Sequence, residues 1–94
     1  MELNFKGSFF RDLNNIGNKY LLIAVKEKIE EAKRAKSSAQ ISRLKQLKTR
    51  KRVWYKIEVR TKHNNKIYWI LCVVRKNLIE FRRIKPEMYF KRKY

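Results

Sequence analysis

Residues 53–60 read VWYKIEVR, and apolar and charged side chains alternate along the run. A period of two residues is typical of a β-strand that buries one face. The two faces of such a strand would carry Val53, Tyr55, Ile57 and Val59 on one side and Trp54, Lys56, Glu58 and Arg60 on the other. The sequence therefore predicts a strand that lies between a packed core and an open, charged surface.

The segments after this strand predict two further strands with short connections. Residues 61–65 are rich in turn-forming side chains, and residues 66–74 (KIYWILCVV) are apolar at most positions, as expected at the centre of a sheet. A second turn at 75–77 leads to residues 78–84 (LIEFRRI), and Pro86 is expected to end the pairing. Short connections between successive strands indicate an antiparallel meander.

Helical spacing dominates the N-terminal half. A short strand at residues 2–5 precedes two predicted helices, one over 9–16 with Ser8 as its N-cap and one over 19–36 with Asn18 as its N-cap. The buried face of the longer helix is predicted to carry Leu22, Val25, Ile29 and Ala32.

The expected element order is β-α-α-β-β-β in one domain that spans residues 1–94. Residues 41–47 are expected to form a short turn with an apolar side. Two helices on one face of an antiparallel sheet make an α+β fold. The other sheet face has no helices, and Lys56, Glu58 and Arg60 are expected to point out of it.

Charge indicates the class of partner. The chain carries 26 Lys and Arg against 8 Asp and Glu, a formal net charge of +18. An excess of this size is usually compensated by nucleic acid, an anionic membrane or an acidic protein. Basic residues are concentrated at 33–62 and 75–94, where Trp54 and Tyr89 are interspersed. Cations bind phosphate and exposed rings stack on unpaired bases, so this mixture favours RNA.

Several other classes of site are not expected. Cys72 is the single cysteine and lies in an apolar run, which excludes an internal disulfide and favours a buried thiol. One histidine and eight scattered acidic residues offer no spacing typical of a zinc or magnesium site, so neither a metal nor a cofactor is expected. No apolar run of about 18 residues could span a membrane, and no signal peptide is recognisable, so the chain is expected to be cytoplasmic without a membrane partner.

Five short motifs follow one another along the chain: residues 9–16 (FFRDLNNI), 41–48 (ISRLKQLK), 55–59 (YKIEV), 79–84 (IEFRRI) and 87–89 (EMY). In order and spacing they resemble the RelE/ParE superfamily of toxins from bacterial type II toxin–antitoxin systems. Members of that family begin F-x-x-D-L-x-x-I and carry a Y-[RK]-I-x-[VI] strand. The resemblance covers nearly the whole chain. It implies a ribosome-dependent mRNA endonuclease that is silenced by a cognate antitoxin, which the charge predicts to be acidic.

The resemblance also implies a site on the open sheet face and at the C-terminal end. In the family's metal-independent mechanism, the ribose 2′-hydroxyl attacks the adjacent phosphate in line, which requires a base, cations and an acid. By position, Lys56 and Arg83 are expected to hold phosphate, Glu58 to act as the base, Lys85 to offset transition-state charge and Tyr89 to stack on a nucleobase. Further RNA contacts are expected from Arg50, Lys51, Arg52, Trp54, Arg60, Lys66 and Arg82.

The sequence departs from the family pattern in three places. Tyr68 and Trp69 stand where an arginine is usual, Lys85 replaces a second arginine near the end, and residues 49–52 (TRKR) replace the linker glycine. Two alternatives therefore stay open beside the endonuclease: a ParE-like gyrase poison, and a non-enzymatic RNA- or ribosome-binding module. Glu58 also has two interpretations, a catalytic base or one partner of a cross-strand salt bridge with Lys66 or Arg82.

Overall fold

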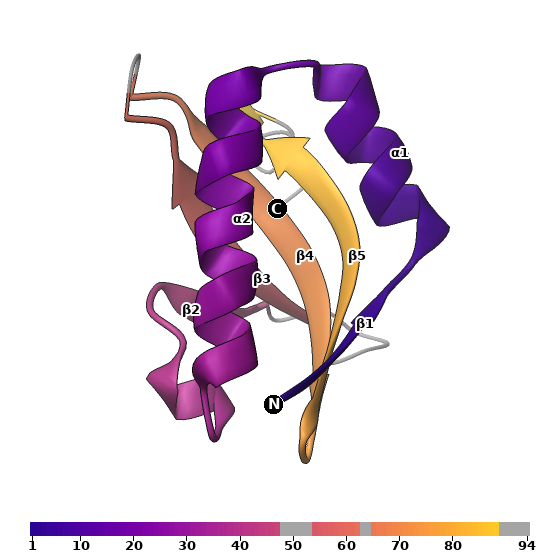
Figure 1. Ribbon diagram of the computed structural model, residues 1–94, viewed down its shortest axis with the longest axis vertical. Helices are drawn as coiled ribbons and strands as arrows, with labels where there is room; N and C mark the ends of the chain where they lie inside the picture. Colours follow the sequence, from indigo (N-terminus) through magenta and orange to yellow (C-terminus); the bar gives the residue numbers. More distant parts are fainter. Residues whose placement is uncertain (48–53, 63–64, 89–94) are drawn as a thin grey trace.

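The computed structural model describes residues 1–47, 54–62 and 65–88 and has two layers (Figure 1). One layer holds the helices α1 (Gly7–Ile16) and α2 (Lys19–Arg34), and the other is a five-stranded sheet. The strands are β1 (Glu2–Phe5), β2 (Leu44–Leu47), β3 (Trp54–Arg60), β4 (Ile67–Arg75) and β5 (Leu78–Pro86), and the 3₁₀ turn η1 (Ser38–Gln40) precedes β2. The α+β class predicted from the sequence is confirmed.

The sheet is mixed, with the strand order β1-β5-β4-β3-β2. Strands β2 to β5 are antiparallel neighbours, as the predicted meander requires, whereas β1 runs parallel to β5 with Leu3 beside Ile79. The prediction of a wholly antiparallel sheet is therefore wrong at one edge. Connectivity explains the difference, because two helices separate β1 from the later strands and a crossover of that length lets strands pair in parallel.

Strand β2 is an element that the sequence patterning missed. Leu44 and Leu47 are three residues apart, a spacing that resembles one side of a helical turn. In a strand the same spacing places them on opposite faces. Leu44 packs against the main core and lies opposite Ile57, while Leu47 lies opposite Trp54 and packs on the other side of the sheet. The observed element order therefore differs from the predicted one by an additional edge strand, β2, before β3.

The main hydrophobic core lies between the helices and the sheet. Its most buried side chains include Phe9, Leu21, Val25, Ala32, Ile57, Val59, Ile70 and Phe81. Burial of Ile57 and Val59 and the packing of Tyr55 against the core confirm the predicted inner face of β3 at these three positions, and Val53 lies outside the described residues. The predicted burial of Leu22 is wrong: Leu22 is 44% exposed, whereas Leu21 is fully buried. Leu21 and Val25 are one helical turn apart, so the apolar stripe of α2 begins one residue earlier than expected.

Helix α1 covers the part of β5 that extends past β1. Strand β1 pairs only with residues 78–81. Beyond them, the Ser8 hydroxyl donates to the Arg82 carbonyl at 2.7 Å, and the Asp12 carboxylate accepts from the Ile84 N–H at 3.1 Å. Ser8 is therefore not the N-cap of a helix that starts at residue 9, because α1 begins at Gly7. Two side chains one helical turn apart instead satisfy an otherwise unpaired strand edge.

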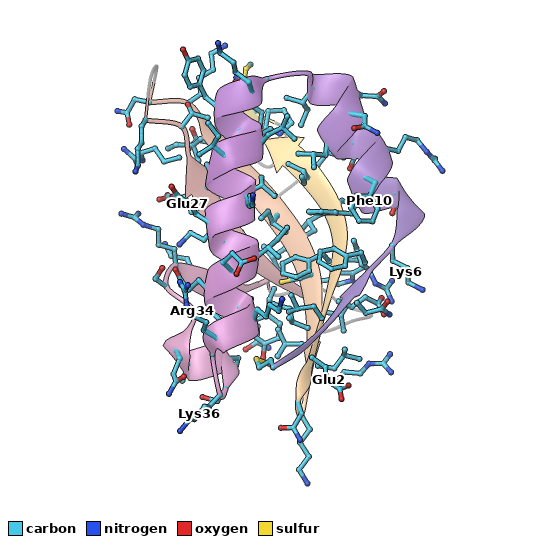
Figure 2. All side chains as sticks on the ribbon, in the orientation of Figure 1. Glu2, Lys6, Phe10, Glu27, Arg34 and Lys36 are labelled. Carbon is cyan, nitrogen blue, oxygen red and sulfur yellow. The ribbon has the colours of Figure 1, made fainter. Side chains whose placement is uncertain are left out.

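Helix α2 is capped as predicted and presents one side to solvent. The Asn18 side-chain oxygen accepts hydrogen bonds from the backbone N–H groups of Tyr20 and Leu21. Figure 2 shows Glu27 and Arg34 at the surface of this helix. In the described parts of the chain, no helix has both the length and the apolar composition that crossing a bilayer requires.

Candidate nucleic-acid interface

The sheet face opposite α1 and α2, called the helix-free face below, carries a second apolar cluster. Trp69 and Leu71 of β4 are buried there, packed with the partly buried Leu47, Trp54 and Ile67. Their chain neighbours Tyr68 and Ile70 belong to the main core, and side chains alternate along a strand, so Trp69 and Leu71 point the opposite way. This second apolar cluster explains why β4 is apolar on both of its faces.

Two cations lie over the two tryptophan rings of this second apolar cluster. Lys56 Nζ is 4.1 Å from the ring centroid of Trp69, and Arg82 Cζ is 5.1 Å from that of Trp54. The Arg82 Nε–H also donates to Glu80, which fixes the orientation of the guanidinium group. Burial would raise the pKa of Glu80, but this hydrogen bond and nearby positive charge outweigh it and lower the pKa. A guanidinium plane held in this way can stack on a nucleobase.

Strand register arranges cations in a row across the helix-free face. Lys45 of β2 lies directly opposite Lys56 of β3. Lys56 in turn lies opposite Leu71 of β4, and Leu71 opposite Arg83 of β5. The row therefore contains three cations and one apolar residue, which is a surface suited to an extended polyanion.

A second row lies beside the first. It joins Glu58 of β3, Trp69 of β4 and Lys85 of β5. The register thus brings four of the five predicted catalytic residues onto two adjacent rows over three strands: Lys56, Glu58, Arg83 and Lys85. The fifth, Tyr89, lies outside the described residues.

Glu58 is held by arginines from two directions. Its Oε2 accepts a hydrogen bond from Arg43, which precedes β2, and lies 3.9 Å from Arg60 Nη2. Glu58 therefore forms salt bridges, but with Arg43 and Arg60 and not with Lys66 or Arg82, the partners expected from the sequence. The backbone explains the choice, because Arg43 has a positive φ of 62° and its carbonyl accepts from the Glu58 N–H at 3.4 Å.

The Asp12 carboxylate forms ion pairs with two cations of β5, Arg83 and Lys85. Arg83 donates to this carboxylate from Nε at 2.7 Å and from Nη2 at 3.1 Å, and Lys85 Nζ lies 3.8 Å away. Burial would raise the pKa of Asp12, but the hydrogen bonds from Arg83 and from the Ile84 N–H, with the charges of Lys85 and Arg83, lower it below its ordinary value. Arg83 and Lys85 are thus oriented by a carboxylate on α1.

The remaining predicted RNA contacts divide into three groups. Trp54 and Arg82 lie on the helix-free face, and Arg82 is the extra residue of a β-bulge beside Leu71. Arg60 ends β3, and Lys66 lies just before β4, where its backbone N–H donates to Thr61 Oγ1 at 3.1 Å. The predicted contacts Arg50, Lys51 and Arg52 lie outside the described residues.

Three residues that shape this surface, Lys45, Arg43 and Asp12, are not among the site residues predicted from the sequence. Nothing in the local sequence pattern marks Lys45, because β2 does not show the alternation of a strand. Arg43 and Asp12 act through contacts that bridge distant parts of the chain, and Asp12 is 71 residues from Arg83. The one available signal was the spacing of Ser8 and Asp12, which places both on the same side of α1.

The described residues contain no group of three or more His, Cys, Asp or Glu side chains placed to hold a metal ion. No protein-family model, curated protein or solved structure matches the chain.

Proposed function

We propose that this protein binds single-stranded RNA on its helix-free face and, as the toxin of a type II toxin–antitoxin pair, cleaves mRNA on the ribosome. The observation that carries the proposal is the pair of rows in which Lys56 and Glu58 of β3 face Arg83 and Lys85 of β5 across β4. The net charge of +18 supports a polyanionic substrate. In this proposal the protein acts in the cytoplasm, where ribosomes translate.

The distance between Lys56 and Arg83 within the first row suits one phosphate. Lys56 and Arg83 flank β4, so their Cα atoms are about 10 Å apart, two interstrand spacings. Both side chains are long enough to approach a phosphate above Leu71. There they would offset the charge that develops as the 2′ oxygen bonds to phosphorus and the bond to the 5′ oxygen breaks. Glu58, one row away, would take the 2′ proton, and the 5′ oxygen would leave as a hydroxyl with a proton supplied by water.

An acidic antitoxin is part of the same proposal. A surface with this much positive charge would bind cellular RNA without selection unless an anionic partner covered it. A segment that is partly disordered and folds on binding could cover a large basic surface. A pull-down from the native host that returned ribosomal proteins and no small acidic protein would count against this partner.

The test is mRNA cleavage in a reconstituted translation system, read by primer extension. The wild-type chain is expected to cut ribosome-bound mRNA, and the double variant Lys56→Ala, Arg83→Ala to cut at least about 100-fold more slowly, because both cations act on the transition state. The matched control is Lys26→Ala, Lys33→Ala, which removes the same charge from exposed positions on α2. Equal cleavage by the wild type and the site variant would refute the site.

A second candidate function is RNA binding without cleavage. It is favoured by the contacts of Glu58, because Oε2 already faces Arg43 and Arg60 and would have to exchange one of them for the substrate hydroxyl. The same assay separates the two candidates. A non-enzymatic module would slow translation and bind RNA but leave every mRNA intact.

A further inference from the structure

Arg43, the residue before β2, has a backbone conformation that costs stability. Its φ is 62°, in the left-handed region that glycine adopts without strain and that a long side chain rarely occupies. Its carbonyl accepts from the Glu58 N–H at 3.4 Å, which extends the pairing of β2 with β3 by one residue. Glycine would meet the same backbone requirement at a lower cost, so the fold does not require an arginine there. Strained residues of this kind are concentrated at functional sites.

The pairing places Arg43 at one end of the second row on the helix-free face. Glu58 lies opposite Trp69 of β4, and Trp69 lies opposite Lys85 of β5. Arg43 is on the other side of Glu58, and its guanidinium group donates to Glu58 Oε2. The carboxylate proposed to act as the base therefore has a cation beside it on the side away from β5.

Of the two arginines that contact Glu58, Arg43 is better placed to move. Arg60 Nη2 lies 3.9 Å from Glu58 Oε2, and Arg60 Nη1 also donates to the Asn65 side chain at 3.3 Å. The Arg43 side chain is 59% exposed, and an ion pair at that exposure adds little stability because water screens it. A guanidinium group offers a phosphate the same paired N–H donors that it offers a carboxylate. A bound phosphate can therefore draw the Arg43 side chain away from Glu58 while the backbone stays paired.

We propose that Arg43 exchanges Glu58 for a phosphate when single-stranded RNA binds, and that this exchange leaves the Glu58 carboxylate able to take the 2′ proton. The phosphate is the one on the 5′ side of the nucleotide that supplies the attacking 2′-hydroxyl, because Arg43 lies on the far side of Glu58 from the scissile phosphate. In the free protein the carboxylate is held by Arg43 and Arg60, so the base stays engaged until RNA is in place. The inference rests on the proposed function and deepens it, because it adds Arg43 as an RNA contact and as the residue that positions Glu58.

RNA affinity measured by fluorescence anisotropy tests the contact. The probe is a fluorescein-labelled 12-nucleotide oligouridylate with every 2′-hydroxyl methylated, so that binding is measured without cleavage. Arg43→Gly removes the side chain and adopts the positive φ without strain. It is expected to weaken binding about 5-fold at 0.1 M salt and to reduce the slope of log K against log salt by about 0.7, the value for one phosphate contact in single-stranded nucleic acid. Lys26→Gln, an exposed charge on α2, is the control and should change neither quantity by a comparable amount.

A second substitution separates the exchange from a simple contact. Glu58→Gln releases the Arg43 side chain before RNA binds and also removes a negative charge from the surface. It should tighten binding of the probe about 5-fold in the wild-type background and at most about 2-fold beside Arg43→Gly, because only the first background contains the competition. An arginine that served the fold alone would show no such coupling. Equal tightening in the two backgrounds would overturn the exchange.

The remaining outcomes distinguish this inference from the proposed function. If Arg43→Gly bound the probe like Lys26→Gln, the Arg43 contact would be wrong while the proposed function stood. A melting temperature of Arg43→Gly more than about 8 °C below that of the wild type would also overturn the exchange, because the fold would then depend on the pair that RNA has to break. If the wild type did not bind the probe at any salt concentration, the proposed function would fail, and the inference with it.

Discussion

Removal of the Asp12 carboxylate should loosen the edge of the sheet that carries Arg83 and Lys85. The carboxylate is 9% exposed, accepts from the backbone N–H of Ile84 and from two nitrogens of Arg83, and lies 3.8 Å from Lys85 Nζ. Asp12→Ala removes all of these contacts at once. Asp12→Asn keeps the size of the side chain and an oxygen that can accept from Ile84, but it loses the charge.

The expected cost follows from the exposure of each partner. An unsatisfied buried N–H at Ile84 costs about 1–3 kcal/mol. The Arg83 side chain is 42% exposed and can be rehydrated, so its pair with Asp12 contributes at most about 1 kcal/mol. Asp12→Ala should therefore lower the free energy of unfolding by about 2–3 kcal/mol, and Asp12→Asn by about 1 kcal/mol. In a domain of this size each kcal/mol shifts the melting temperature by about 4–8 °C.

Thermal melts followed by circular dichroism at several pH values measure these differences. The pKa of Asp12 in the folded chain is below its ordinary value of 3.8. The stabilising effect of its charge is therefore fully present above about pH 4 and is lost as the pH falls through the lower folded value. The gap between the wild type and Asp12→Asn should be constant from pH 5 to 8 and should narrow below pH 4.

Two results would refute this reasoning about Asp12. One is an Asp12→Ala protein that melts within about 3 °C of the wild type, since the Ile84 N–H alone accounts for more than that. The other is a gap between the wild type and Asp12→Asn that widens as the pH falls below 4, which would mean that the charged carboxylate destabilises the fold.

Three further predictions concern the site and the core. Glu58→Gln should reduce mRNA cleavage at least about 100-fold if Glu58 is the base; a loss of at most about 1 kcal/mol of stability with cleavage retained would assign it only to its ion pairs with Arg43 and Arg60. RNA binding by the wild type should show a slope of log K against log salt of magnitude about 4 or more, as expected for about six phosphate contacts, and a flat response would exclude a phosphate-binding face. Burial raises the pKa of the Cys72 thiol to about 12, so at pH 8 a thiol reagent should react only as fast as the chain unfolds, and complete reaction of the native protein within seconds would contradict that burial.

The elements that sequence reasoning predicted best are those long enough to show their period. Strand β3 alternates over seven residues, and α2 extends over 16 residues with a recurring apolar stripe. Even there, the stripe was placed on Leu22 in place of Leu21, because adjacent leucines both fit a helical period within one residue.

The features that the sequence did not predict have a different physical origin. Strand β2 has only four residues, and Leu44 and Leu47 serve two different apolar clusters, so no single-face pattern exists to find. The parallel pairing of β1 depends on the path of the two helices that follow it. The position of Asp12 between Arg83 and Lys85 depends on how α1 packs against β5, which no local pattern in the sequence encodes.

The central claim is that RNA contacts the helix-free face, and the site of contact can be measured directly. RNA that contains 4-thiouridine can be crosslinked to the wild-type protein by light and the attached peptides identified by mass spectrometry. Crosslinks are predicted in β3 (Trp54–Arg60) and β5 (Leu78–Pro86), with α2 (Lys19–Arg34) unmodified. Crosslinks concentrated on α2, with none on β3 or β5, would contradict the claim.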